Sequence, residues 1–127
     1  MVLFLYLYIM KNSPIGIFDS GIGGLTVANA IKNVLPNENI IYFGDTEHLP
    51  YGEKSEEAIQ SFSKKIITFL VEKKCKIIVI ACNSASSVAD KSVTIIAGKT
   101  SVFNVIDTTI VLPFLSRLYL CSRILFG

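Results

Sequence analysis

Three short segments of this chain carry side chains able to bind or transform a small polar ligand. They are DSG at residues 19–21, PYG at residues 50–52 and CNS at residues 82–84. A carboxylate or a hydroxyl can hold an ammonium group, and the backbone N–H groups of a glycine-rich turn can hold a carboxylate. A deprotonated thiol can act as a nucleophile or as a base. Asp19, Ser20, Tyr51 and Cys82 are therefore the first candidates for a functional site.

Cys82 is the sharpest of these candidates. It ends the apolar run at residues 77–81 and precedes small polar residues typical of a helix N-terminus, where the helix dipole favours a thiolate. It could serve as a nucleophile, a general base or a metal ligand. A metal site is disfavoured because no second cysteine stands at ligand spacing and His48 is the only histidine. The plainer alternative is a small buried residue at a strand end, and packing is the role we infer for Cys75 and Cys121.

The other candidates also have plainer explanations. Asp19 could orient an ammonium group, or it could simply form the turn before the glycines. Tyr51 could close over a ligand or pack within its loop, and we interpret His48 as a loop residue. A dinucleotide site, with Asp45 after the second strand, is disfavoured because Thr26 stands where the fingerprint needs its third glycine.

The elements that must position these residues alternate between strand and helix. Apolar segments of strand length lie at residues 15–18, 40–43, 77–81 and 102–106. Helices are predicted at residues 25–35, where Pro36 stops the helix, and after the capping residue Ser55. The alternation predicts an α/β fold, an open parallel sheet with helices on both faces and right-handed crossovers.

The predicted topology gathers the candidate residues at one edge of the sheet. Ligands of open parallel sheets bind at the carboxyl ends of the strands. Each of the three candidate segments follows a predicted strand at that end. We therefore expect Asp19, Tyr51 and Cys82 to line one open cleft.

Composition restricts the class of protein. Of the 127 residues, 51% are hydrophobic and 17% charged, and the net charge is +2, so neither disorder nor a nucleic-acid surface is expected. Three cysteines match no disulfide framework, which favours a reducing cytoplasm. The apolar run at residues 2–9 is too short to cross a membrane and lacks the features of a signal peptide, and Met10 offers a second start.

Changes in composition along the sequence suggest three parts. We expect an apolar N-terminal extension at residues 1–14, an α/β domain at residues 15–107 and a divergent apolar tail at residues 108–127. The strand–helix alternation stops after Asp107.

Four motifs, taken in their order, resemble the signatures of glutamate racemases. They are GIFDSGIGGL at residues 16–25, YFGDT at residues 42–46, LPYG at residues 49–52 and ACNSA at residues 81–85. The resemblance runs from about Ile15 to Asp107. The family commonly has threonine at the position of Ser84, and serine keeps the hydroxyl.

The resemblance implies cofactor-independent interconversion of L- and D-glutamate in the cytoplasm, for peptidoglycan synthesis, cell-wall biogenesis and cell shape. It implies two cysteines on opposite faces of the substrate α-carbon, of which Cys82 matches the first, with Asp19 as a second catalytic residue. The residues expected to contact glutamate are Asp19, Ser20, Pro50, Tyr51, Gly52, Asn83 and Ser84. No cofactor, metal, nucleic acid or membrane partner is expected, and a homo-oligomer is left open.

The second cysteine of the family lies in a Thr-Cys-Thr-His segment, which Cys121 does not match. We therefore expect the fold to be incomplete relative to the two-domain family fold, and this polypeptide to be inactive by itself. Two alternatives stay open. One is a non-catalytic fragment that binds glutamate or serves as an interaction module, and the other is a related racemase acting on aspartate.

Overall fold

The computed structural model describes residues 10–88, 91–104 and 116. These residues form a four-stranded sheet in the order β2-β1-β3-β4, in which every pair of neighbouring strands is parallel. The strands are β1 (Ile15–Asp19), β2 (Ile40–Gly44), β3 (Ile77–Ile80) and β4 (Ser101–Asn104). The predicted parallel sheet is confirmed.

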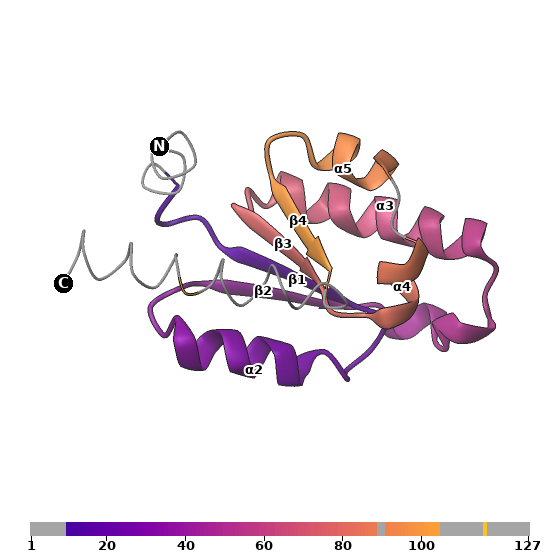
Figure 1. Cartoon of the computed structure of the whole chain (residues 1–127), viewed down its shortest axis with the longest axis horizontal. Helices are drawn as coiled ribbons and strands as arrows, with labels where there is room; N and C mark the ends of the chain where they lie inside the picture. The colour runs from indigo at the N-terminus through magenta and orange to yellow at the C-terminus, as the bar shows by residue number, and fades with distance from the viewer. Residues whose placement is uncertain (1–9, 89–90, 105–115, 117–127) are drawn as a thin grey trace.

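Helices cover both faces of the sheet, as predicted (Figure 1). Helix α2 (Leu25–Val34) packs on one face, whereas α3 (Glu56–Glu72), α4 (Asn83–Val88) and α5 (Lys91–Ala97) lie on the other. Among the described residues, no helix is long and apolar enough to cross a membrane.

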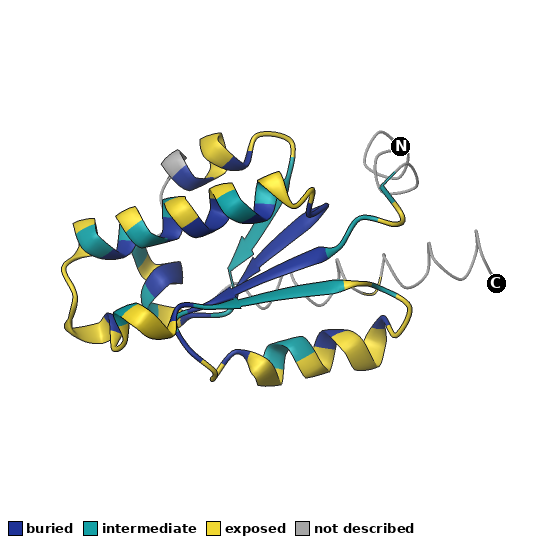
Figure 2. Cartoon of the chain, turned by 180° about the vertical axis from the view of Figure 1, so that it is seen from behind, coloured by how far each residue is buried: buried dark blue, intermediate teal, exposed yellow. Residues whose placement is uncertain are grey.

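The apolar run of β3 follows from this layered arrangement. Ile78 and Ile80 join the core beneath α3, and Ile77 and Val79 join the core beneath α2. A central parallel strand has no face left for polar side chains, so all four residues are buried (Figure 2). The edge strands β2 and β4 are only half-buried.

Local signals set the ends of the helices. The Ser55 side chain accepts a hydrogen bond from the Ala58 N–H at 3.2 Å, which caps α3, and Glu56 and Glu57 occupy the first turn of α3. Helix α2 ends at Val34, and the buried Leu35 is its C-cap residue immediately before Pro36.

Some of the predicted segments lie outside the described residues. These are residues 1–9 of the N-terminal extension, the end of the fourth predicted strand, and the tail except for position 116. The α/β domain is described from Ile15 to Asn104 apart from residues 89–90.

Candidate functional site

The three candidate segments meet at the carboxyl edge of the sheet. Asp19 ends β1, Asp45 directly follows β2, and Cys82 stands two residues after the end of β3. Backbone hydrogen bonds fix this edge, because the Asp45 N–H donates to the Asp19 carbonyl at 2.9 Å and the Ala81 N–H donates to the Phe18 carbonyl at 2.7 Å. The topology therefore brings Asp19 and Cys82 to the same edge of the sheet, as expected, with Asp45 beside them.

The Asp19 carboxylate is buried, with 5% of the residue exposed, and one of its oxygens is already occupied. Oδ2 accepts hydrogen bonds from the Gly24 N–H at 2.7 Å and from the Tyr42 hydroxyl at 3.0 Å. Burial and the Asp19 carboxylate raise the pKa of Tyr42, so this phenol stays protonated and remains a donor. Among the described residues, Asp19 Oδ1 receives no hydrogen bond, which leaves it available for an ammonium group.

The glycines of the turn at residues 21–24 allow neighbouring segments to approach closely. They do not adopt unusual backbone angles. Among the described residues, Gly98 is the glycine with a positive φ, so the glycines of this turn do not adopt left-handed backbone angles. A Cβ on Gly24 would lie 2.9 Å from the Cβ atoms of Asp19 and Ala81. A Cβ on Gly44 would lie 2.3 Å from the Gly21 carbonyl oxygen. These two positions let β1, β2 and the turn approach one another.

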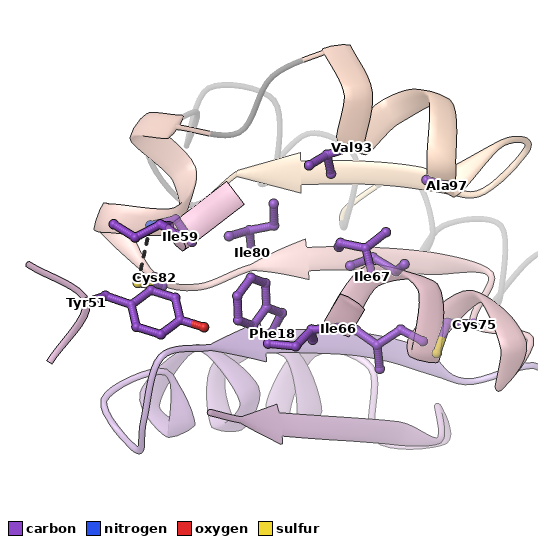
Figure 3. Packing of buried hydrophobic residues seen from close by; sticks show 13 residues of the cluster. Phe18, Tyr51, Ile59, Ile66, Ile67, Cys75, Ile80, Cys82, Val93 and Ala97 are labelled. Carbon is purple, nitrogen blue, oxygen red and sulfur yellow. Dashed lines mark hydrogen bonds between the residues drawn. The ribbon is translucent and has the colours of Figure 1, made fainter. Parts of the chain in front are cut away.

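Cys82 is buried, with 6% of the residue exposed, and belongs to the core beneath α3 (Figure 3). Its Sγ accepts a hydrogen bond from the Ala85 N–H at 3.4 Å, in the first turn of α4. Cys82 therefore places a thiol at the carboxyl edge of the sheet, between the end of β3 and α4.

Tyr51 lies in the same core, with 2% of the residue exposed. Its ring makes an edge contact with Phe18 at 6.3 Å between centroids, and its hydroxyl donates to Asp45 Oδ2 at 2.5 Å. Burial raises the pKa of Tyr51, and the charges of Asp45, Cys82 and Asp19 raise it further. Tyr51 therefore remains a protonated phenol and cannot act as the base.

The outer residues of the predicted site are less buried. Pro50, Gly52 and Asn83 are exposed, and Ser20 and Ser84 are half-buried. Asp19, Tyr51 and Cys82 are thus more buried than the other residues predicted to contact the ligand. The cleft itself stays a prediction, as do the roles of all these residues. In the described part of the chain, no group of three His, Cys, Asp or Glu side chains could hold a metal ion.

Asp45 and His48 are two polar residues whose connection sequence reasoning missed. Asp45 is 7% exposed and accepts hydrogen bonds from Tyr51 and from the His48 ring, whose Nδ1 lies 2.8 Å from Oδ1. The position of Asp45 directly after β2, parallel to that of Asp19 at the end of β1, was a signal that could have found it.

Comparisons with known proteins show which proteins this chain is similar to. No protein-family model matches the chain. A glutamate racemase of Caldanaerobacter subterraneus is 52% identical over 98 residues, which cover 77% of this chain and 34% of that protein. A glutamate racemase of Neisseria meningitidis is 50% identical over 97 residues, which cover 76% of this chain and 36% of the relative.

Solved structures show the same likeness. Glutamate racemase of Francisella tularensis in complex with D-glutamate superposes with a TM-score of 0.75 and 47% identity, over 80% of this chain and 39% of that one. The Thermus thermophilus enzyme in complex with β-chloro-D-alanine gives a TM-score of 0.71 and 44% identity, over 76% and 37% of the two chains. This chain spans about a third of the length of the curated relatives it matches. In sequence and in fold, it is similar to the N-terminal part of glutamate racemases.

Proposed function

We propose that this domain supplies one half of a glutamate racemase active site, with Cys82 as the acid–base group on one face of the substrate α-carbon. The observation that carries the proposal is the meeting of Cys82, Asp19 and Tyr51 at the carboxyl edge of a sheet that is similar to those of glutamate racemases. The similar enzymes of Francisella tularensis and Escherichia coli were solved with D-glutamate and L-glutamate, respectively.

The chemistry divides between proton transfer and charge stabilisation. Cys82 Sγ, as the thiolate, takes the α-proton, so the Cα–H bond breaks while an S–H bond forms and the electron pair stays on the substrate. The α-proton is weakly acidic, so a thiolate base is effective only where water is excluded and donors face the developing charge. The burial of Cys82 supports the first condition, and in this proposal the backbone N–H groups of the exposed Gly52 and Asn83 supply the donors.

Asp19 has a complementary role in this proposal. Its Oδ2 is held by Gly24 and Tyr42, and Oδ1 would accept from the substrate ammonium group. Ser20, Pro50, Tyr51 and Ser84 complete the proposed contacts with glutamate. Racemisation at this site would supply D-glutamate for peptidoglycan in the cytoplasm.

Inversion also needs a second acid–base group on the opposite face of the α-carbon. Cys75 cannot provide it, because Cys75 precedes β3 at the amino edge of the sheet, where its Sγ packs against Gly16 (Figure 3). We therefore propose that the 127-residue polypeptide alone binds glutamate without racemising it efficiently.

The test is a chimera in which the aligned residues of this chain replace those of the Caldanaerobacter glutamate racemase. We expect the purified chimera to racemise glutamate, and Cys82→Ala to lower kcat by at least about 10³-fold, as the loss of an essential acid–base group does. Cys75→Ala is the matched control and should keep its activity. A folded chimera whose racemisation survives Cys82→Ala would contradict the proposal.

A further inference from the structure

The Asp45 carboxylate joins two aromatic side chains beside the proposed site. One oxygen accepts the Tyr51 hydroxyl at 2.5 Å, and both lie within hydrogen-bond distance of His48 Nδ1, at 2.8 and 2.9 Å. Charge-assisted hydrogen bonds of this kind are short and strong, and a buried carboxylate needs them to offset its lost hydration.

The same cluster is anchored to the sheet and to α3. The Asp45 N–H donates to the Asp19 carbonyl, which ties the carboxylate to the end of β1. The His48 ring stacks on Phe62 of α3 with centroids 3.9 Å apart and planes inclined by 23°, and Tyr51 contacts the same Phe62 at 5.8 Å. Asp45 thus links the two short 3-10 helices, η1 (Thr46–His48) and η2 (Tyr51–Glu53), to the end of β1.

We propose that Asp45 is a positioning residue that fixes η2, and with it Tyr51 and Gly52, at the carboxyl edge next to Cys82. A phenol has one proton, and Tyr51 gives it to Asp45. The Tyr51 oxygen is therefore left only as an acceptor toward a ligand. Its hydroxyl serves to hold the loop and not to protonate the substrate.

A contribution of Asp45 to glutamate binding rests on the proposed function. The role of Asp45 in holding η2 does not. The Lys54 N–H donates to the Tyr51 carbonyl at 3.0 Å, and the Glu53 N–H donates to the Pro50 carbonyl at 3.3 Å. Exchange of these two amide hydrogens therefore reports whether η2 stays closed, with no ligand present.

The experiment compares the ¹⁵N-labelled 127-residue chain with Asp45→Asn, Tyr51→Phe and the double variant. Glu47→Gln is the matched control, because Glu47 is an exposed acid on the same 3-10 helix. We expect exchange at Glu53 and Lys54 to rise about 10-fold or more in both single variants, the loss expected for a charge-assisted hydrogen bond. The amides of α3 and β3 should change much less, and the double variant should add little because both changes break one contact.

Two further readouts separate positioning from general destabilisation. The wild-type chain should show a slowly exchanging, strongly downfield hydroxyl proton in its ¹H spectrum, which disappears in Tyr51→Phe and moves in Asp45→Asn. Glutamate, titrated into the wild-type chain, should shift the amide signals of Gly52 and Asn83, and Asp45→Asn should weaken this binding about 10-fold.

Unchanged exchange at Glu53 and Lys54 in both single variants would overturn the proposal, and so would an equal rise across α3 and β3. Additive effects in the double variant would also overturn it, since Asp45 would then act apart from Tyr51. If wild type shows no response to glutamate, the proposed function fails for this polypeptide, and amide exchange still decides the role of Asp45.

Discussion

The position of the Asp19 carboxylate depends on Gly24, which has no Cβ. The Gly24 N–H can reach Asp19 Oδ2 because no Cβ stands between the turn and the end of β1. The Tyr42 hydroxyl reaches the same oxygen from the neighbouring strand. One oxygen of the Asp19 carboxylate, Oδ2, is therefore held by hydrogen bonds within the fold. The other, Oδ1, accepts none from the described residues.

Gly24→Ala should therefore destabilise the fold and displace Asp19. The added Cβ would lie 2.9 Å from two other Cβ atoms, and such overpacking costs about 1–3 kcal/mol of unfolding free energy. Gly23→Ala is the matched control, because nothing lies within 4 Å of its Cβ position, and it should stay within about 0.5 kcal/mol of wild type. Urea unfolding of wild type and the two variants measures these changes in the free energy of unfolding. Equal stabilities of Gly24→Ala and Gly23→Ala would contradict the prediction.

Cys75 gives a pH-dependent prediction. Burial raises the pKa of its thiol from 9.0 to about 11. Because the folded chain holds this proton more tightly, the stabilisation is complete below pH 9 and is lost as the pH rises toward 11. Native Cys75 should therefore resist iodoacetamide at pH 9, and it should react readily once urea unfolds the chain, as peptide mass spectrometry would show. Fast labelling of native Cys75 at pH 9 would contradict this.

At the residue scale, the sequence alone can identify side chains whose type is itself reactive. Cys82 and Asp19 can be selected as candidates from the sequence because each is a reactive type at the end of an apolar run, and their roles stay predictions. The connection of Asp45 to Tyr51 and His48 depends on how a loop folds back on α3, and no local pattern encodes that contact. The glycines at residues 21–24 predict a turn, but the close approach of separate segments at Gly24 is a property of tertiary structure.

At the scale of elements, predictability follows the strength of the local signal. Helix α3 has a cap, acidic residues in its first turn and a continuous apolar face, and β3 is uniformly apolar. The 3-10 helices η1 and η2 fall in a segment predicted only as a loop, because such short turns are held by tertiary contacts. Helix α5 was not predicted, since its seven residues carry little periodic pattern.

The amino edge of the sheet contains an ion pair that joins separate elements. The buried Lys76, just before β3, lies with its Nζ 2.5 Å from Glu38 Oε2, in the segment that leads into β2. Removing the acid leaves a buried ammonium without its counter-charge, whereas removing the lysine leaves a partly exposed carboxylate.

Glu38→Gln should accordingly destabilise the fold more than Lys76→Met does. We expect a loss on the order of 3 kcal/mol for Glu38→Gln, and roughly 1 kcal/mol or less for Lys76→Met, whose chain can fill the same apolar space. Thermal or urea unfolding of both variants at pH 7 gives the comparison. The reverse order would show that Lys76 is stabilised by other groups.

For the whole molecule, the decisive feature is that the described thiols lie at opposite edges of the sheet. Cys82 follows the carboxyl end of β3 and Cys75 precedes its amino end, so only Cys82 can approach a ligand at the predicted site (Figure 3). Cys121 lies outside the described residues. We therefore propose that this domain serves one face of the glutamate α-carbon through Cys82.

The most direct measurement follows α-deuterium uptake and optical rotation when the 127-residue chain is incubated in heavy water with L-glutamate or with D-glutamate. One acid–base group removes and returns the proton on the same face. We therefore expect slow uptake from one enantiomer, far below the roughly 1–10³ per second typical of enzymes, with little change in rotation and loss of uptake in Cys82→Ala. Uptake from both enantiomers at equal rates, inversion at ordinary enzymatic rates, or no uptake above that of Cys82→Ala would contradict it.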